Sequence, residues 1–451
     1  MGSTYLSASN RTGGSQAVVN VSVLENVTSV TGAYHAYSLE EINDKVAHIY
    51  LAPIIFVGIL MVIGVVGNGL VLYIYSLKFK SSSHRVFIIV LSFVDLVTCS
   101  IGMPFVIVDF RYSLIFYFVS ICKTLRFVNY FMSLSSAFIL IAIAVDRYRK
   151  ICLPWRKQMS LYLVRISCCI SLVLGFAVSW PAPVLFGYNT VQIGYGNLTG
   201  ASCQTDDKYK NKPYQAYFNI TLLFILFGVF LSLTTLYSLI GRQIYYQGRN
   251  ARGRMKRNSS QAALNLQQIQ TAGNENNSIE KDRKDSSINK QYCTEKETGL
   301  TITINSTSLS RTNDSSTSNT GCKKKRIRHR TTRQYSRNID SLEKCAQRKY
   351  RRLFRTTFMM FVISVVFFIS YFPHIFLHVA TFVNQDFVLS MSNAEYATYV
   401  VFLYSFFINN VANPFIYGMF DSKFRKEIMY LWMRASEKSP IKLSMKDNDY
   451  N

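Results

Sequence analysis

Long apolar segments separated by polar stretches dominate the pattern of the chain. Crossing a bilayer as an α-helix takes about 20 mainly apolar residues. Segments of that length are predicted at 49–77, 85–109, 119–146, 161–186, 216–241, 356–383 and 396–419. The pattern therefore predicts an all-α membrane protein, a bundle of seven transmembrane helices.

Two long polar stretches lie outside these segments. Residues 1–47 lack a sustained apolar run, and residues 246–349 are rich in Ser, Thr, Asn and charge. Such stretches cannot bury enough surface to offset the entropy of ordering, so we expect both to be disordered. The predicted domains are the N-terminus 1–47, helices one to five in 48–245, the long basic loop 246–349, and helices six and seven in 350–419.

The chain after the seventh segment has a helical pattern of its own. Apolar residues recur there at helical spacing with basic residues between them: Phe420, Phe424, Ile428 and Leu431, with Lys423, Arg425 and Lys426. This pattern predicts a short amphipathic helix on the membrane surface over 420–435, followed by a cytoplasmic tail, 436–451.

The net charge of +25 and the pI of about 9.7 raise the question of nucleic-acid binding. The basic residues, however, lie mostly in the odd-numbered loops, such as Lys78 and Lys80 in the first and Arg149 and Lys150 in the third. Cytoplasmic loops are enriched in Lys and Arg, so the odd loops are predicted to be cytoplasmic. Nucleic acid is therefore not an expected partner.

Glycosylation acceptors support the same orientation from different residues. Asn10, Asn20 and Asn26 each begin an Asn-x-Ser/Thr triplet in the N-terminus, and Asn197 begins another in the fourth loop. Such acceptors are used on the lumenal or extracellular side. We therefore expect a multi-pass plasma-membrane protein with an extracellular N-terminus.

Catalytic motifs are missing, but one charge inside a span stands out. The sequence has no His-Glu-x-x-His spacing and no Gly-rich phosphate loop, so an enzyme is not expected. Asp95 lies inside the second span, where a carboxylate needs polar partners or a cation. Candidate partners are Asn68, Ser136, Asn409, Asn410 and Asn413. Their oxygens would suit a sodium ion or a proton, and a hydrogen-bonded network that fastens the helices is the alternative.

Short motifs occur in order along the spans. They are Gly67-Asn68, Leu91-x-x-x-Asp95, Cys122, Asp146-Arg147-Tyr148, Trp180, Tyr237-x-x-Ile240, Phe367, Phe372-Pro373 and Asn413-Pro414-Phe415-Ile416-Tyr417. In this order, each on its own span, they resemble the motifs of the rhodopsin-like (class A) family of G-protein-coupled receptors. The resemblance covers about 48–435 without the long loop.

The resemblance implies roles for the motif residues. Arg147 would be released from Asp146 on activation and, with Tyr148 beside it, would face the G protein. Tyr237 and Tyr417 would turn toward Arg147. The remaining implied positions are the hinges and switch at Asn413, Pro414, Phe367, Tyr371 and Pro373.

The resemblance also implies a disulfide and a set of partners. Cys122 and Cys203 look like the family's extracellular disulfide, on the oxidising side of the membrane. The implied partners are an extracellular ligand, a heterotrimeric G protein, receptor kinases, arrestin and membrane lipids. No cofactor is expected beyond a sodium ion at Asp95 acting as an allosteric modulator.

The sequence departs from the family pattern in several places. Tyr371 stands where a Trp is common, the fifth span has no proline, and no cysteine follows Ile428 to carry a palmitoyl anchor. The base of the sixth span has Arg348, Lys349, Arg351, Arg352 and Arg355 but no acid. An ionic lock between Arg147 and the sixth span is therefore not expected, and basal activity should be raised.

The ligand is approached through the residues that would line the pocket. Asn129 stands where amine receptors carry Asp, and Phe407 where retinal pigments carry the attachment lysine. The predicted pocket is aromatic, polar and mixed in charge: Phe105, Asp109, Arg126, Asn129, Tyr130, Ser133, Tyr371, His374, His378, Leu403 and Phe407. It suits a neuropeptide best; a small non-peptide ligand, amine or lipid, is the alternative. An ion transporter and a membrane scaffold are more remote alternatives.

Overall fold

The computed structural model describes residues 38–193, 198–272, 351, 353–381, 383–384 and 386–437. The chain divides into two compact units. The first comprises Met1–Arg147, Met159–Tyr237 and Phe358–Asn451, and the second comprises Tyr148–Gln158 and Ser238–Thr357. Three boundaries between the units fall inside helices, and the fourth, between Gln158 and Met159, falls in a loop between two helices.

The part of the chain that the structure describes contains seven helices that are long and apolar enough to cross a membrane, as the hydrophobic pattern predicts. Some of these spans are built from more than one element. In order they are α3 (Leu51–Lys78); α4 (Ser83–Val97), η1 (Thr98–Gly102) and α5 (Met103–Arg111); α6 (Val119–Cys152); α7 (Leu161–Ser179) with α8 (Ala182–Leu185); α9 (Tyr214–Ala272); the helix Leu353–Thr381; and α12 (Asn393–Leu403), η3 (Ser405–Phe407) and α13 (Ile408–Phe420).

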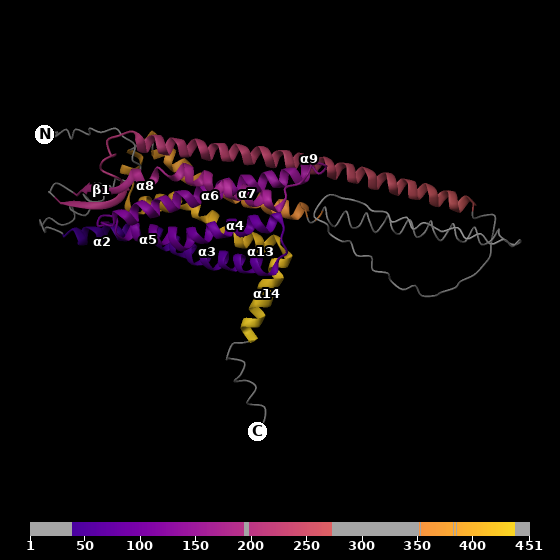
Figure 1. Ribbon diagram of the computed structural model, residues 1–451, viewed down its shortest axis with the longest axis horizontal. Helices are drawn as coiled ribbons and strands as arrows, with labels where there is room; N and C mark the ends of the chain where they lie inside the picture. Colours follow the sequence, from indigo (N-terminus) through magenta and orange to yellow (C-terminus); the bar gives the residue numbers. More distant parts are fainter. Residues whose placement is uncertain are drawn as a thin grey trace, which may run out of the picture. The chain divides into compact units, whose positions relative to one another are not determined.

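A short helix after the seventh span is present, as predicted. Helix α14 spans Ser422–Glu437 and leaves α13 at a steep angle (Figure 1). Asp421 lies at the break, where its Oδ1 accepts hydrogen bonds from the backbone N–H groups of Lys423 and Phe424. This N-terminal cap ends one helix and begins the next.

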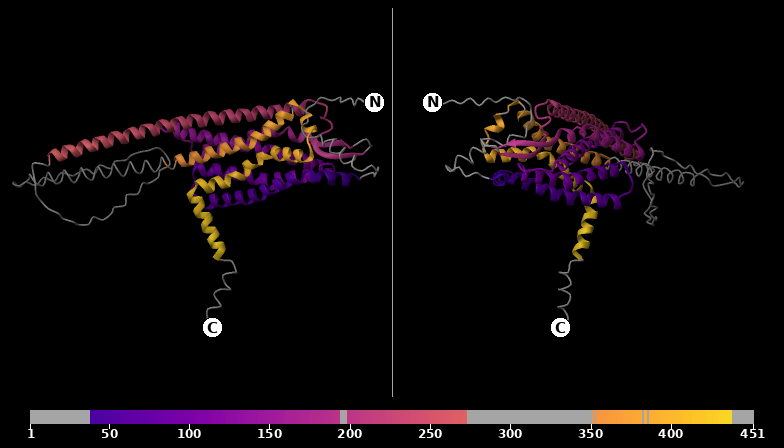
Figure 2. Two further views of the ribbon diagram at one scale, coloured as in Figure 1. Left: turned by 180° about the vertical axis from the view of Figure 1, so that it is seen from behind. Right: turned by 60° about the vertical axis from the view of Figure 1, so that its left-hand side comes forward.

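A β-hairpin covers the other end of the first unit. Strands β1 (Phe186–Gln192) and β2 (Thr199–Thr205) pair antiparallel with Tyr188 opposite Cys203 (Figure 2). The disulfide between Cys122 and Cys203 ties β2 to the start of α6, which confirms the predicted pairing. We call this end of the bundle the hairpin end and the opposite end the α14 end.

The N-terminal prediction was wrong for its last residues. Helix α2 (Leu39–Ile49) lies inside the stretch expected to be disordered. Ser38 and Glu41 form a reciprocal capping box, which satisfies N–H groups at the helix start. Ile42 and Val46, four residues apart, are buried, so the helix has an apolar face to pack. The residues before Ser38, including Asn10, Asn20 and Asn26, lie outside the described ones, and so does Asn197.

The predicted start of the long loop was also wrong. Helix α9 continues past residue 245 to Ala272. Residues 246–272 contain no proline and many good helix formers, so their polarity does not end the helix. Residues 273–349 of the predicted loop lie outside the described part of the chain. Trp180 lies in the fourth span, as expected, where it ends α7 and is 57% exposed.

The second unit holds the connection between α6 and α7. Arg149 donates a hydrogen bond to the carbonyl of Lys157 (2.9 Å), and the Gln158 amide donates to the carbonyls of Leu153 and Arg156 (both 3.1 Å). These bonds hold the loop in a tight turn. Trp155 stands out from it with 95% of its surface exposed.

Candidate functional site

Asp95 is the centre of a buried polar network that joins three helices. Its two carboxylate oxygens accept hydrogen bonds from the side-chain amides of Asn410 (2.8 Å) and Asn413 (2.6 Å) on α13. On α3, Asn68 donates to the carbonyl of Asn410 (2.8 Å) and to that of Gly64 (3.0 Å). A buried carboxylate is expensive unless such donors satisfy it, so this network fastens α3, α4 and α13.

The close approach of α3 to α13 depends on Gly67. A Cβ atom added there would lie 2.9 Å from the ring of Pro414, so any larger residue would push the helices apart. Asn68 is the residue after Gly67, so its hydrogen bond to the Asn410 carbonyl depends on the same close approach of the two helices. The dipeptide Gly67-Asn68 thus provides a small residue and a side-chain amide where α3 contacts α13.

Two further predicted members of the network lie outside its hydrogen bonds. Ser136 Oγ and Asn409 Oδ1 are buried, and neither atom has a hydrogen-bond partner among the described residues. Hydroxyl, amide and carboxylate oxygens are the ligands that a hard cation prefers. By the chemistry of its donors, the predicted set fits a sodium ion.

The charged motif at the α14 end of α6 is buried. Arg147 Nη2 and Asp146 Oδ2 form an ion pair of 2.6 Å, and their side chains are 3% and 1% exposed. The pairing offsets part of the desolvation of both charges. Both partners are neighbours on one helix.

Tyr237 on α9 is held by the sixth span. The Ser364 hydroxyl donates a hydrogen bond to Tyr237 Oη (3.3 Å), and the same hydroxyl lies 3.3 Å from the carbonyl of Met360. The Tyr237 ring also packs edge-on against Phe361, with centroids 5.3 Å apart. Sequence reasoning missed Ser364, since a serine in an apolar span carries no distinctive signal.

Tyr417 at the end of the seventh span is fully buried among aromatic rings. Its ring lies 5.9 Å from that of Tyr75 on α3 and 6.4 Å from that of Phe424 on α14. Tyr75 donates a hydrogen bond to Asp421 Oδ2 (2.7 Å) at the break between α13 and α14. Tyr75 and Asp421 were not foreseen as part of the site, although Asp421 is only four residues after Tyr417 in the sequence.

The predicted switch residues on the sixth span form a stack. The rings of Phe367 and Tyr371 lie 4.5 Å apart, and Phe367 meets Phe230 of α9 edge-on at 5.7 Å. The Tyr371 side chain lies next to Ser133 on α6. The phenol that stands where an indole is usual therefore lies between the third and sixth spans. Pro373 lies two residues after Tyr371.

Arg126 is the most constrained of the predicted pocket residues. It forms an ion pair with Asp109 (2.7 Å), with side chains 12% and 13% exposed, and donates to the carbonyl of Cys203 on β2 (2.9 Å). Its guanidinium lies over the rings of Phe105 (5.6 Å) and Phe186 (5.5 Å). Cation–π contacts and the ion pair together hold the hairpin on the helices.

Other predicted pocket residues have contacts of their own. Tyr130 packs against Phe186 (5.7 Å), and the Asn129 amide donates weakly to the carbonyl of Gly102 (3.4 Å). His374 Nδ1 is 2.6 Å from the carbonyl of Leu403, and Phe407 is buried. Phe186 was not foreseen, because its place depends on the hairpin.

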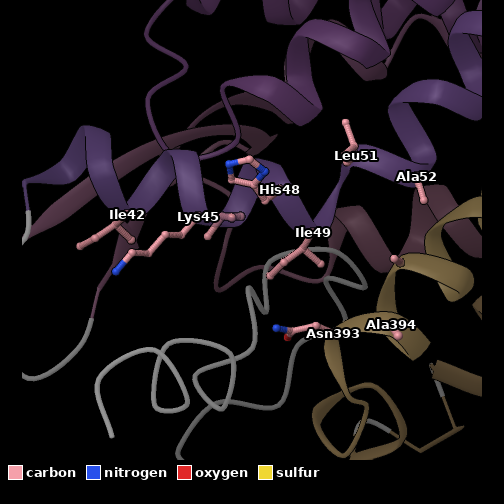
Figure 3. Close-up of a pocket in the computed structure, with 10 residues that line it drawn as sticks. Ile42, Lys45, His48, Ile49, Leu51, Ala52, Asn393 and Ala394 are labelled. Carbon is pink, nitrogen blue, oxygen red and sulfur yellow. The ribbon is translucent and has the colours of Figure 1, made fainter. Parts of the chain in front are cut away.

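A separate groove lies at the same end, between α2 and the start of α12 (Figure 3). Its volume is about 510 Å³. The lining is mainly apolar and shares no residue with the predicted pocket: Ile42, Lys45, Val46, His48, Ile49, Leu51, Ala52, Asn393, Ala394 and Ala397. Next to it, Tyr50 stacks on Phe110 (5.0 Å) and shares a hydrogen bond with Tyr396. Burial and the nearby Tyr396 raise the pKa of Tyr50, which keeps this hydroxyl neutral.

The order of these features matches a known family. The family described as "7 transmembrane receptor (rhodopsin family)" matches residues 67–417. The chain belongs to this family. The receptor is also similar in fold to the crystal structure of squid rhodopsin, with a TM-score of 0.55 at 18% identity over 93% of this chain and 97% of the other.

Relatives of the receptor are similar at low identity. The C3a anaphylatoxin chemotactic receptor of Danio rerio is 24% identical over 49% of this chain and 61% of its own length. Rhodopsin of Todarodes pacificus is 29% identical over 43% of this chain and 42% of its own. The neuropeptide S receptor of Homo sapiens is 23% identical over 42% and 50%. The receptor thus spans about half the length of these relatives.

Proposed function

We propose that the receptor binds an extracellular neuropeptide and activates a heterotrimeric G protein by outward movement of the sixth helix. The observation that carries the proposal is the buried ion pair of Asp146 and Arg147 at the α14 end. Asp146 lies on the same helix as Arg147, so breaking this ion pair does not by itself separate two helices. Arg147 is therefore suited to change partners when the bundle opens.

The aromatic contacts around it supply the moving parts. In the resting arrangement Tyr237 is held by Ser364, and Tyr417 lies between Tyr75 and Phe424. Outward movement of the sixth helix separates Ser364 from Tyr237 and frees the Tyr237 hydroxyl to join Arg147. Tyr237 would thus have two alternative partners, Ser364 in the resting arrangement and Arg147 in the active one, and two such discrete arrangements form a switch.

The pocket at the hairpin end supports a peptide ligand. Arg126 and Asp109 offer charges of both signs beneath a hairpin backbone, and aromatic rings surround them. Backbone groups and side chains of a peptide can use all of these. Two of the relatives are named as receptors for neuropeptide S and galanin, and another for C3a anaphylatoxin.

The proposal includes the orientation and partners that the sequence predicts. The N-terminus and the hairpin end face the outside of the cell, and the α14 end faces the cytoplasm. Receptor kinases and arrestin are further cytoplasmic partners. Exposed Trp155, among basic residues of the second unit, offers an apolar contact for the G protein. A sodium ion, when bound, would be held by Asp95 together with Ser136, Asn409, Asn410 and Asn413. Its charge would balance that of the Asp95 carboxylate.

A screen tests the function directly. Cells that express the receptor are exposed to a panel of secreted peptides and to a panel of lipids and amines, with sensors for each G-protein class. We expect a peptide to produce nucleotide exchange, and Arg147→Ala to remove the response at equal surface expression. Lys157→Ala, at an exposed basic residue of the loop that follows α6, is the control. A response to a lipid alone, or an intact response in Arg147→Ala, would contradict the proposal.

A further inference from the structure

Two histidines on the sixth span face each other at the hairpin end. His374 and His378 are four residues apart on the helix Leu353–Thr381, a spacing that brings side chains to one face. Their ring centroids are 4.5 Å apart at an interplanar angle of 78°. Both residues are half-buried. Two imidazoles at this spacing on a helix are a recurrent metal-binding arrangement.

The hydrogen bond of His374 fixes which nitrogen is available. Its Nδ1 lies 2.6 Å from the carbonyl oxygen of Leu403 on α12. A carbonyl can only accept, so Nδ1 carries the proton and Nε2 of the neutral ring carries the lone pair. Metal-binding histidines are oriented in this way, since they donate the second ring N–H to a carbonyl or carboxylate.

The ring of His378 has no such partner. Among the described residues its ring contact is with His374, and neither of its nitrogens forms a hydrogen bond. The surroundings of the pair are aromatic, with Phe406 at 4.9 Å and Tyr371 at 6.4 Å from the ring of His374. A half-buried imidazole beside a preoriented one is thus left with its lone pair unused.

We propose that His374 and His378 form a binding site for a divalent transition-metal ion, with Zn²⁺ as the best fit. Zinc–nitrogen bonds of about 2.0–2.1 Å in tetrahedral geometry put two imidazole centroids about 5 Å apart. The observed separation of 4.5 Å is close to this value. The second torsion of histidine is broad, so rotation of the His378 ring can turn its lone pair toward an ion bound at Nε2 of His374.

The site has two protein ligands and open coordination positions. No group of three or more His, Cys, Asp or Glu side chains suited to a metal occurs among the residues that the structure describes. Water, or a donor atom of the bound ligand, would therefore complete the coordination. Imidazole ligands select zinc, copper and nickel over calcium and magnesium. The site does not depend on the receptor's having a peptide ligand.

Zinc titration of the purified, tag-free receptor tests the proposal. Equilibrium dialysis should give one saturable zinc site that calcium and magnesium do not occupy. His374→Ala and His378→Ala each remove one of the two zinc ligands. Loss of a residue that only hydrogen-bonds a ligand already weakens metal binding by about tenfold or more, so each variant should bind zinc at least about tenfold more weakly. His48→Ala, on α2, is the matched control and should bind like the unchanged receptor. Equal binding in all four proteins, or no saturable binding, would overturn the proposal.

A spectroscopic measurement keeps the test independent of the variants' folding. The unchanged receptor is loaded with one equivalent of Cu²⁺, and its electron paramagnetic resonance spectrum is recorded. Two imidazole nitrogens bound to the ion should produce the corresponding superhyperfine splitting. A spectrum with one nitrogen or none overturns the two-histidine site.

Discussion

The resting state of the receptor should depend on the Ser364–Tyr237 hydrogen bond. Ser364→Ala removes the hydroxyl that lies 3.3 Å from Tyr237 Oη and leaves the rest of the sixth helix unchanged. A buried neutral hydrogen bond contributes about 0.5–1.5 kcal/mol. If the bond exists only in the resting arrangement, its loss shifts the balance toward the active one by about two- to thirteenfold.

The assay is nucleotide exchange on a G protein without agonist, at matched surface expression. Basal exchange should rise in Ser364→Ala, while the maximal agonist response is kept. Ser370→Ala is the control, since the Ser370 hydroxyl is buried on the same helix but donates to the carbonyl of Phe367 in that helix (3.1 Å). Tyr237→Phe should behave differently, with a reduced maximal response, because the active arrangement also uses the tyrosine hydroxyl. Equal basal exchange in Ser364→Ala and Ser370→Ala would refute the reasoning.

Other bonds give further predictions. Asp109→Ala should lower the stability to thermal unfolding by about 3–5 kcal/mol, because Arg126 would keep a buried charge without its partner; adding Arg126→Met should recover part of the loss. Asp95→Asn should abolish any difference in thermal stability between sodium and choline chloride, since the amide carries no charge to hold the cation. Tyr75→Phe removes a bond to a carboxylate of about 1.5–3 kcal/mol and should speed amide hydrogen exchange in α14. Asn43→Ala removes two side-chain bonds that hold α2 and should speed tryptic cleavage of that helix.

The sequence could predict the spans and the centre of the bundle because each depends on one large free-energy cost. Seven long apolar segments are costly to expose to water, so they lie in lipid. A carboxylate inside one of them, Asp95, is costly to bury without hydrogen-bond donors. The two asparagines that bind Asp95 belong to the polar cluster Asn409, Asn410 and Asn413 of the seventh span, on α13. Their roles in signalling stay predictions.

The pairing of Arg126 with Asp109 was less accessible from the sequence. The second span is interrupted by the π-helical turn η1 (Thr98–Gly102) between Asp95 and Asp109. One extra residue in a turn rotates everything after it by about 100° relative to a regular helix. An unbroken helix would therefore give Asp109 a different direction. In contrast, the capping box of Ser38 and Glu41 was readable, and it could have predicted α2.

The two buried guanidinium groups of α6 explain how the ends of the bundle differ. Arg126 pairs with Asp109 on another span, so this ion pair fastens two helices. The ion pair of Arg147 is with Asp146, which moves with it, so that pair cannot fasten one helix to another. Links to the sixth helix near the α14 end include neutral ones: Ser364 to Tyr237, and Phe358 edge-on to Phe420 at 5.4 Å. Neutral contacts of this size are broken at small cost, so the α14 end should open while the hairpin end stays closed.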